Sequence, residues 1–257
     1  MTPYELNHHI RLAVKRISYV SKTTLRNGSS GKNTSVQGVM TFPHLNNRIP
    51  FNSSVERDFL LSCKLDKQIT FIESQPFSIS FNSYNNEKDR TYTPDYYIRR
   101  DLGLKPSQFT LSTAASEIII EVKRIADLKY LSDRDVERLA AAAVWAMQSD
   151  ERDFLIITDG FFTSEKGETI RLLAGFVEVP ITSAAQALLD ILNRSSPIEV
   201  NTAYELLTIA GYSLAEAEEA MLLSMANGWL ETETFKIPSE SDKLYWRDVD
   251  ENPDPET

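Results

Sequence analysis

Cysteine and long apolar runs are scarce in this sequence, and each shortage excludes a class of protein. Cys63 is the single cysteine among 257 residues, so the chain cannot form an internal disulfide and suits a reducing compartment. No apolar run approaches the roughly 18 residues needed to span a bilayer. The opening residues also lack the apolar stretch of a secretory signal. We therefore expect a cytoplasmic protein.

Histidine is also rare, which bears on metal binding. The chain has three histidines, His8, His9 and His44. None has a cysteine or histidine partner at the spacing that zinc sites use. We therefore expect no zinc site.

Charge is plentiful but uneven. Hydrophobic residues make up 42% and charged residues 25%, as in ordinary globular proteins, and the formal net charge is −10. Residues 1–50 nevertheless carry seven Lys or Arg against the single acid Glu5, a net charge of +6, which leaves −16 for the remainder. A basic segment on an acidic body is typical of a protein that meets DNA with one surface. A solvated N-terminal segment explains the same charge equally well.

Changes in composition divide the sequence into four parts. Residues 1–50 form a basic N-terminal arm that includes a loop-like segment rich in Ser, Gly, Asn and Thr. Residues 51–178 mix strand and helix patterns and predict an α/β domain. Residues 179–249 are mainly helical, and residues 250–257 form an acidic tail that we expect to be disordered.

The pattern of residues 51–178 predicts a mixed sheet flanked by helices. We expect one or two strands over 69–81, and a turn at 85–89 followed by a strand over 90–100. Residues 116–124 predict a buried strand because their apolar run is β-branched. The remaining expected elements are a helix over 53–65, a helix over 132–150 capped by Ser132, and a strand over 154–160.

The C-terminal part predicts three helices followed by a small hairpin, the order of a winged-helix domain. The helices are expected over 181–194, 201–211 and 213–230. The third of them carries Glu216, Glu218 and Glu219 and no Lys or Arg. Because DNA phosphates would repel these carboxylates, we expect this domain to dock a protein rather than read bases.

Asp95, Glu121 and Lys123 have the residue types and spacing of a catalytic site. Asp95 falls in a predicted strand, and Glu121 and Lys123 are two residues apart in another, so their side chains share one face. Two carboxylates on adjacent strands can hold a divalent cation. An ammonium group beside them can orient water and offset phosphate charge. Burying such charges is costly unless they are paired or bound to metal.

Structural roles remain open for the same residues. Asp95 can make a hydrogen bond at a strand end, and Glu121 and Lys123 can form an ion pair on a solvated face. Ile119 shares the face of Glu121 and Lys123, which favours a cleft over open solvent.

Pro94-Asp95 followed by Glu121-Val122-Lys123 resembles the PD-(D/E)xK nuclease superfamily, whose fold is restriction-endonuclease-like. The segments SSVERDFLLSCKL, ITFIESQPFSISF, RTYTPDYYI and IIIEVKR, in this order, resemble the TnsA-like transposon endonucleases. This resemblance implies that Asp95, Glu121 and Lys123 are catalytic. It also implies that Glu56, on the first predicted helix, joins Asp95 and Glu121 as a metal ligand. Ser53 and Glu56 have the spacing of a capping box as well, which is an alternative role for Glu56.

The resemblance further implies the activity and the partners. It implies a bacterial cytoplasmic enzyme that uses Mg²⁺, with Mn²⁺ as a substitute, to cut the 5′-ended strands at transposon ends. The partners it implies are DNA, the DDE-type transposase TnsB and the AAA+ regulator TnsC. A stand-alone nuclease of restriction or repair type and a non-catalytic transposition assembly factor remain alternatives. Cleavage by the isolated protein would favour the stand-alone nuclease.

Overall fold

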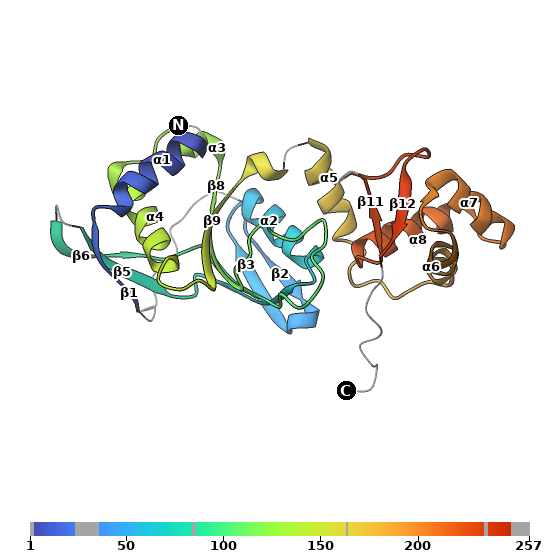
Figure 1. Cartoon of the computed structure of the whole chain (residues 1–257), viewed down its shortest axis with the longest axis horizontal. Helices are drawn as coiled ribbons and strands as arrows, with labels where there is room; N and C mark the ends of the chain where they lie inside the picture. The colour runs from blue at the N-terminus through green and yellow to red at the C-terminus, as the bar shows by residue number, and fades with distance from the viewer. Residues whose placement is uncertain (1–2, 24–35, 84–85, 163, 234–235, 248–257) are drawn as a thin grey trace. The chain divides into compact units, whose positions relative to one another are not determined.

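The computed structural model describes residues 3–23, 36–83, 86–162, 164–233 and 236–247 (Figure 1). The chain divides into two compact units. The first consists of Met1–Leu60, Gln68–Pro106 and Thr110–Phe162, and the second of Leu61–Lys67, Ser107–Phe109 and Thr163–Thr257. These boundaries differ from the expected ones, because residues 1–50 belong to the first unit and residues 163–178 to the second. The predicted acidic tail lies outside the described residues.

A mixed four-stranded sheet forms the centre of the first unit, as expected. Its strands, in spatial order, are β4 (Ile69–Ser74), β7 (Tyr96–Arg100), β8 (Glu117–Lys123) and β9 (Arg152–Thr158). The pairs β4–β7 and β7–β8 are antiparallel, whereas β8–β9 is parallel. Strand β8 is therefore paired on both edges, and Ile118, Ile119 and Ile120 are fully buried. This burial confirms the strand predicted from the β-branched run.

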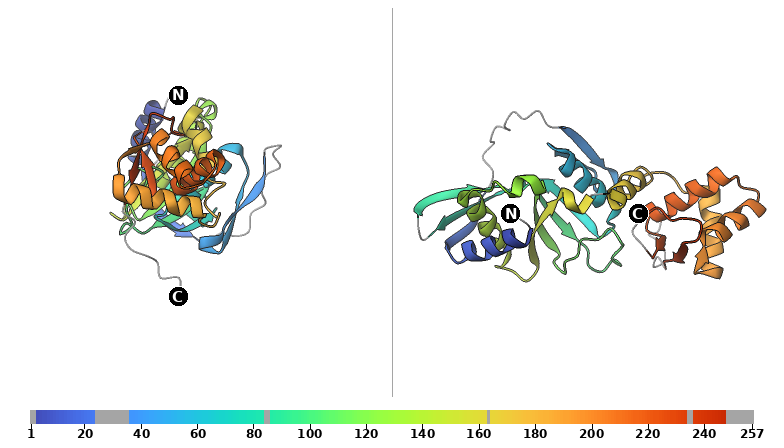
Figure 2. Two further views of the ribbon diagram at one scale, coloured as in Figure 1. Left: turned by 90° about the vertical axis from the view of Figure 1, so that its right-hand side faces the viewer. Right: turned by 90° about the horizontal axis from the view of Figure 1, so that it is seen from above.

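Helix α4 (Asp133–Ala146) covers one face of this sheet, where it packs on β8 and β9. Ser132 and Asp135 form the capping box that begins it, as predicted. Ile119 joins Val136 and Leu139 of α4 in one apolar core. Helix α1 (Pro3–Val14) lies against α4, which Figures 1 and 2 show within the first unit.

Helix α2 (Ser54–Leu65) approaches the sheet through the side chains of the other face. Its Phe59 ring lies 5.3 Å from the ring of Tyr96, measured between centroids. Tyr96 pairs with Ile120 on β8, and side chains alternate along a strand. The side chain of Glu121 therefore points away from the α2 face, toward α4.

The described part of the first 50 residues, 3–23 and 36–50, belongs to the first unit rather than forming a separate arm. Strand β1 (Ile17–Thr23) pairs with β5 (Ser78–Ser83), which pairs with β6 (Asn86–Tyr92) to complete a three-stranded antiparallel sheet. Strands β2 (Gly38–Phe42) and β3 (Asn47–Phe51) form a hairpin. Apolar side chains explain this incorporation: Ile10, Ala13, Ile17 and Val20 are buried in the core under α4. Most of the predicted loop, residues 24–35, lies outside the described residues.

Two predictions for residues 85–100 are wrong. Asn86 already begins β6, whereas we expected a turn there, because pairing with β5 overrides the turn-like composition. The single strand expected over 90–100 is two strands of different sheets, since β6 ends at Tyr92 and β7 begins at Tyr96. Asp95 consequently lies in the bend between them, not within a strand.

The second unit contains the three predicted helices and a small antiparallel sheet. The predicted helices are α6 (Ser183–Ser195), α7 (Val200–Ile209) and α8 (Leu214–Ala226), and a further helix, α5 (Ser164–Leu173), precedes them. The strands are β10 (Ile198–Glu199), β12 (Lys243–Trp246) and β11 (Leu230–Thr232), in that spatial order. Leu188, Leu207 and Leu223 are buried between the helices.

Short helical segments complete the chain. They are the 3-10 turns η1 (Pro43–Leu45) and η2 (Asp159–Phe162) and the helix α3 (Ile125–Leu128). Within the described ranges, no helix has the length and apolarity to cross a membrane.

Candidate active site

Asp95 bonds to the end of β8 through its side chain. The β7–β8 ladder stops at the Tyr96–Ile120 pair, so the Val122 N–H lies beyond it. Asp95 Oδ2 accepts a hydrogen bond from that N–H at 2.7 Å. The Asp95 carbonyl accepts another from the Gln75 N–H at 2.8 Å. The bend is therefore fixed on both sides, and the carboxylate sits beside the backbone between Glu121 and Lys123.

Glu121 is a buried carboxylate with a partner on each oxygen. The residue is 5% exposed. Its Oε1 lies 2.5 Å from the Lys123 Nζ, and its Oε2 accepts a hydrogen bond from the Tyr92 hydroxyl at 2.5 Å. Lys123 keeps about a third of its side chain exposed, at 32%. The pair thus joins a buried anion to a cation that reaches solvent.

Burial and the neighbouring charge of Glu121 together set the electrostatics around Asp95. Burial, followed by the charge of Glu121, raises the pKa of Asp95 from 3.8 to about 8, against the opposing effects of Lys123 and the Val122 N–H. Burial by itself lowers the pKa of Lys123, but Glu121 and Asp95 outweigh it and the pKa is raised. Lys123 therefore carries its charge at neutral pH, while Asp95 holds its proton unless a further cation arrives.

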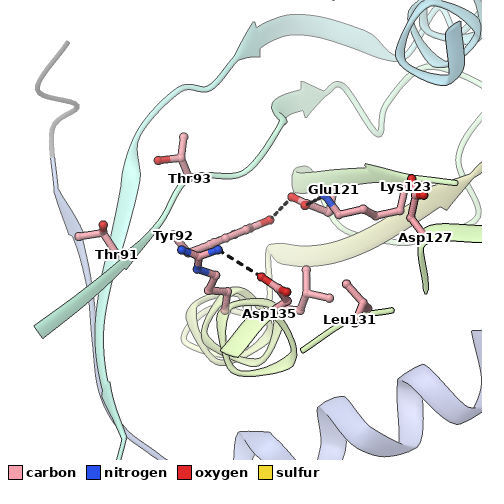
Figure 3. Close-up of a pocket in the computed structure, with 10 residues that line it drawn as sticks. Thr91, Tyr92, Thr93, Glu121, Lys123, Asp127, Leu131 and Asp135 are labelled. Atoms are coloured by element: carbon pink, nitrogen blue, oxygen red, sulfur yellow. Dashed lines mark hydrogen bonds and ion pairs between the residues drawn. The ribbon is translucent and has the colours of Figure 1, made fainter. Parts of the chain in front are cut away.

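A pocket of about 570 Å³ opens beside this group (Figure 3). Glu121 and Lys123 form part of its wall. The other lining residues are Thr91, Tyr92, Thr93, Asp127, Leu131, Asp135, Arg138 and Leu139. Figure 3 shows Tyr92 reaching toward Glu121 from one side, with Lys123 extending along β8 on the other. The pocket gives a ligand access to the Lys123 ammonium and to the buried carboxylate.

Glu56 has a different set of partners. It forms a capping box with Ser53: the Glu56 N–H donates to Ser53 Oγ at 3.1 Å, and Ser53 Oγ donates to Glu56 Oε1 at 3.0 Å. Its Oε2 accepts from the Asn52 N–H and from the Tyr96 hydroxyl, both at 3.0 Å. Glu56 is the last and smallest of the five influences on the pKa of Asp95. The structure thus brings Asp95, Glu121 and Lys123 together and places Glu56 at the start of α2.

Carboxylate oxygens are the ligands that Mg²⁺ and Mn²⁺ prefer, and Asp95 and Glu121 supply them. Burial and the charge of Glu121, which Lys123 does not fully offset, raise the pKa of Asp95, and a divalent cation beside the two carboxylates would lower it. The residues present therefore fit such an ion. Across the part of the chain that the structure describes, no group of three or more His, Cys, Asp or Glu side chains is close enough to hold one by itself.

Sequence reasoning missed Tyr92. A tyrosine buried in an apolar core needs a partner for its hydroxyl, and that is a usable signal. The partner could not be found from the sequence, because Tyr92 lies in the β1–β5–β6 sheet and Glu121 in the other. Asp127 and Asp135 were also missed as pocket residues, since both lie in helices beyond β8.

The central sheet, with an aspartate bonded to a strand that ends in Glu-Val-Lys, is consistent with an α/β nuclease fold. Residues 66–159 match the family described as TnsA-like endonuclease N terminal. This match supports a TnsA-like endonuclease, the family that the motifs predicted. It includes Asp95, Glu121 and Lys123 but not Glu56. A comparison with curated proteins finds no match.

Proposed function

We propose that this protein is a divalent-metal-dependent DNA endonuclease subunit of a heteromeric transposase, which cuts the 5′-ended strands at transposon ends. One observation carries the proposal: Asp95 bonds to the backbone between Glu121 and Lys123, inside the segment that matches the TnsA-like family. That arrangement combines two crowded carboxylates with one ammonium beside an open pocket.

Asp95 and Glu121 would hold the metal ion, Mg²⁺ with Mn²⁺ as a substitute. When bound, the ion supplies Lewis-acid stabilisation of the negative charge that develops on the phosphate. The protein contributes the carboxylates in fixed positions, through the Val122 N–H and the Tyr92 hydroxyl. Because Asp95 must lose a proton to bind, we expect metal affinity to increase as the pH rises toward 8. A ligand role for Glu56 is implied only by the resemblance.

Lys123 is the residue that we assign to the phosphate and the attacking water. Its ammonium lines the pocket and is held by Glu121, so its position is set before substrate binds. A fixed positive charge offsets the charge that phosphodiester cleavage develops, without reorganisation during the reaction. The ammonium can also orient a water molecule by hydrogen bonding.

We assign protein docking to the second unit and propose that its helices α6 to α8 and its small sheet form a winged-helix domain. Helix α8 carries Glu216, Glu218 and Glu219 and no basic residue, which disfavours contact with phosphates. The proposed partners are the transposase TnsB and the AAA+ regulator TnsC, which would position the nuclease on transposon ends.

The first test is Mn²⁺ titration by calorimetry in the presence of a short DNA duplex. Wild type should bind Mn²⁺ and Asp95→Ala should lose binding while keeping its circular dichroism spectrum, because half of the carboxylate pair is removed. Asp150→Ala, an exposed aspartate outside the site, is the matched control and should bind as wild type. Equal binding by wild type and Asp95→Ala would reject this site.

A cleavage assay with each strand labelled separately then tests the reaction. It uses duplexes that carry transposon ends, with the purified transposase and regulator added or omitted. Metal-dependent cuts confined to the 5′-ended strands, and lost in Asp95→Ala, are the expected result. Cleavage that survives the substitution would contradict the proposed chemistry.

A further inference from the structure

Tyr92 reaches the proposed site from outside the central sheet. It is the last residue of β6, and its ring is buried at 7% exposure in the core that holds Ile119 and Leu139. Its hydroxyl donates to Glu121 Oε2 at 2.5 Å (Figure 3). Such a length is typical of a hydrogen bond to an ionised carboxylate, which is stronger than a bond between neutral groups.

The two partners of Glu121 differ in rigidity. Lys123 holds Oε1 through a flexible four-carbon chain that is 32% exposed, so it follows the carboxylate rather than fixing it. Tyr92 holds Oε2 through a buried aromatic ring with few rotamers. The orientation of the Glu121 carboxylate is therefore determined mainly by Tyr92.

The connection along the chain adds to this effect. Only two residues separate Tyr92 from Asp95, and the two side chains contact consecutive residues of β8, Glu121 and Val122. The intervening bend is held by the hydrogen bond between the Ser78 and Thr93 hydroxyls, at 2.9 Å. One short segment therefore sets the positions of both carboxylates relative to each other.

We propose that Tyr92 is a positioning residue of this site, which holds Glu121 at the spacing from Asp95 that a divalent cation requires. The inference rests on the proposed function, since it assigns metal binding to the same two carboxylates. Partners that orient metal ligands in this way affect metal affinity by about 10- to 100-fold when removed.

Tyr97 provides a matched control within the same segment of the chain. Its hydroxyl also bonds to a glutamate of β8, but to Glu117, at the opposite end of the strand. Its ring packs against Phe77 near the same core. Tyr97→Phe therefore removes the same kind of contact between hydroxyl and carboxylate without reaching the site.

The experiment titrates Mn²⁺ into wild type, Tyr92→Phe and Tyr97→Phe by calorimetry, without DNA. We expect the dissociation constant to rise about 10- to 100-fold in Tyr92→Phe and to stay unchanged in Tyr97→Phe. The number of sites per chain separates positioning from folding. If the substitution only reduced the amount of folded protein, the number of sites per chain would fall in proportion. If it removed the orientation of Glu121, the dissociation constant of every site would rise instead.

The other possible results of this titration reject either the positioning role of Tyr92 or the proposed function as well. Wild-type affinity in Tyr92→Phe, or an equal loss in Tyr97→Phe, would reject the positioning role and leave the proposed function intact. A reduced number of sites with an unchanged dissociation constant would also reject it. Absence of Mn²⁺ binding by wild type, with and without DNA, would reject the proposed function and the inference together.

Discussion

Glu121, near the end of β8, and Glu56, in the first turn of α2, each accept a hydrogen bond from a tyrosine that flanks the same Thr-Pro-Asp bend. Their other partners differ. Glu56 is held by Ser53 and the Asn52 N–H, contacts that begin a helix. Glu121 forms an ion pair with Lys123 and is close enough to Asp95 to raise the pKa of that residue. Two glutamates with similar tyrosine contacts thus belong to different structures, a helix cap and a charged cluster.

This contrast shows which residue roles can be carried over from a family by sequence position and which cannot. The resemblance assigns metal binding to both glutamates, but only Glu121 shares a sheet face with Lys123 and the pocket. A carboxylate whose hydrogen bonds close a helix turn has fewer lone pairs left for an ion. The predictions below test this division, beginning with the largest expected effect.

Removal of the Lys123 ammonium should have the largest effect on activity. Lys123→Ala should lower the rate of DNA cleavage about 10²- to 10³-fold, because a preorganised charge beside the phosphate is lost. Mn²⁺ binding should persist, since Asp95 and Glu121 remain. Rates are measured on labelled duplexes, with Lys129→Ala, an exposed lysine nearby, as the control. A cleavage rate for Lys123→Ala within threefold of the wild-type rate would show that Lys123 is not part of the active site.

The carboxylate pair should make the stability of the metal-free protein depend on pH. The pKa of Asp95 is 3.8 unfolded and about 8 folded, so the native state retains a proton that the unfolded state releases. The stabilisation from this proton is complete below about pH 4 and is lost as the pH rises toward 8. Asp95→Asn cannot titrate and should be more stable than wild type at pH 8, by up to about 5 kcal/mol, because the folded and unfolded pKa values of Asp95 lie far apart.

Urea unfolding of both proteins at pH 5 and pH 8, with a chelator present, measures this difference. The stability gap should open between the two pH values, and added Mn²⁺ should stabilise wild type alone. If the free energy of unfolding changed equally with pH in the two proteins, Glu121 and burial would not control the protonation of Asp95.

The smallest effect is expected at Glu56, and it should fall on stability rather than on metal binding. Glu56→Ala removes the capping box and should lower the free energy of unfolding by about 1 kcal/mol. The dissociation constant for Mn²⁺ should stay near the wild-type value. A tenfold weaker affinity at unchanged stability would instead assign Glu56 to the metal, as the resemblance implies.

Local patterns were sufficient for much of the fold. The β-branched run at 118–120 predicted β8, and Ser132 predicted the start of α4, because both depend on neighbouring residues. The strand beginning at Asn86 was not predictable from composition, because it depends on pairing with β5. The integration of residues 1–50 was missed because charge, rather than the apolar pattern around Ile10 and Ile17, guided that expectation.

The sequence by itself predicted the resemblance to TnsA-like endonucleases, which residues 66–159 support, as well as the mixed sheet and Asp95, Glu121 and Lys123 as candidate site residues. The order of the motifs and the alternation of side chains between the two faces of a strand can both be read directly from the sequence. The tertiary structure alone decided that Asp95 lies in a bend, that Tyr92 crosses from another sheet to Glu121, and that Glu56 closes a helix. The Asp95–Val122 and Tyr92–Glu121 contacts join residues 27 and 29 positions apart in the chain. The role of Glu56 depends on which of several neighbouring groups bonds to it. Tertiary packing therefore decides these contacts, and the spacing of residues along the chain does not.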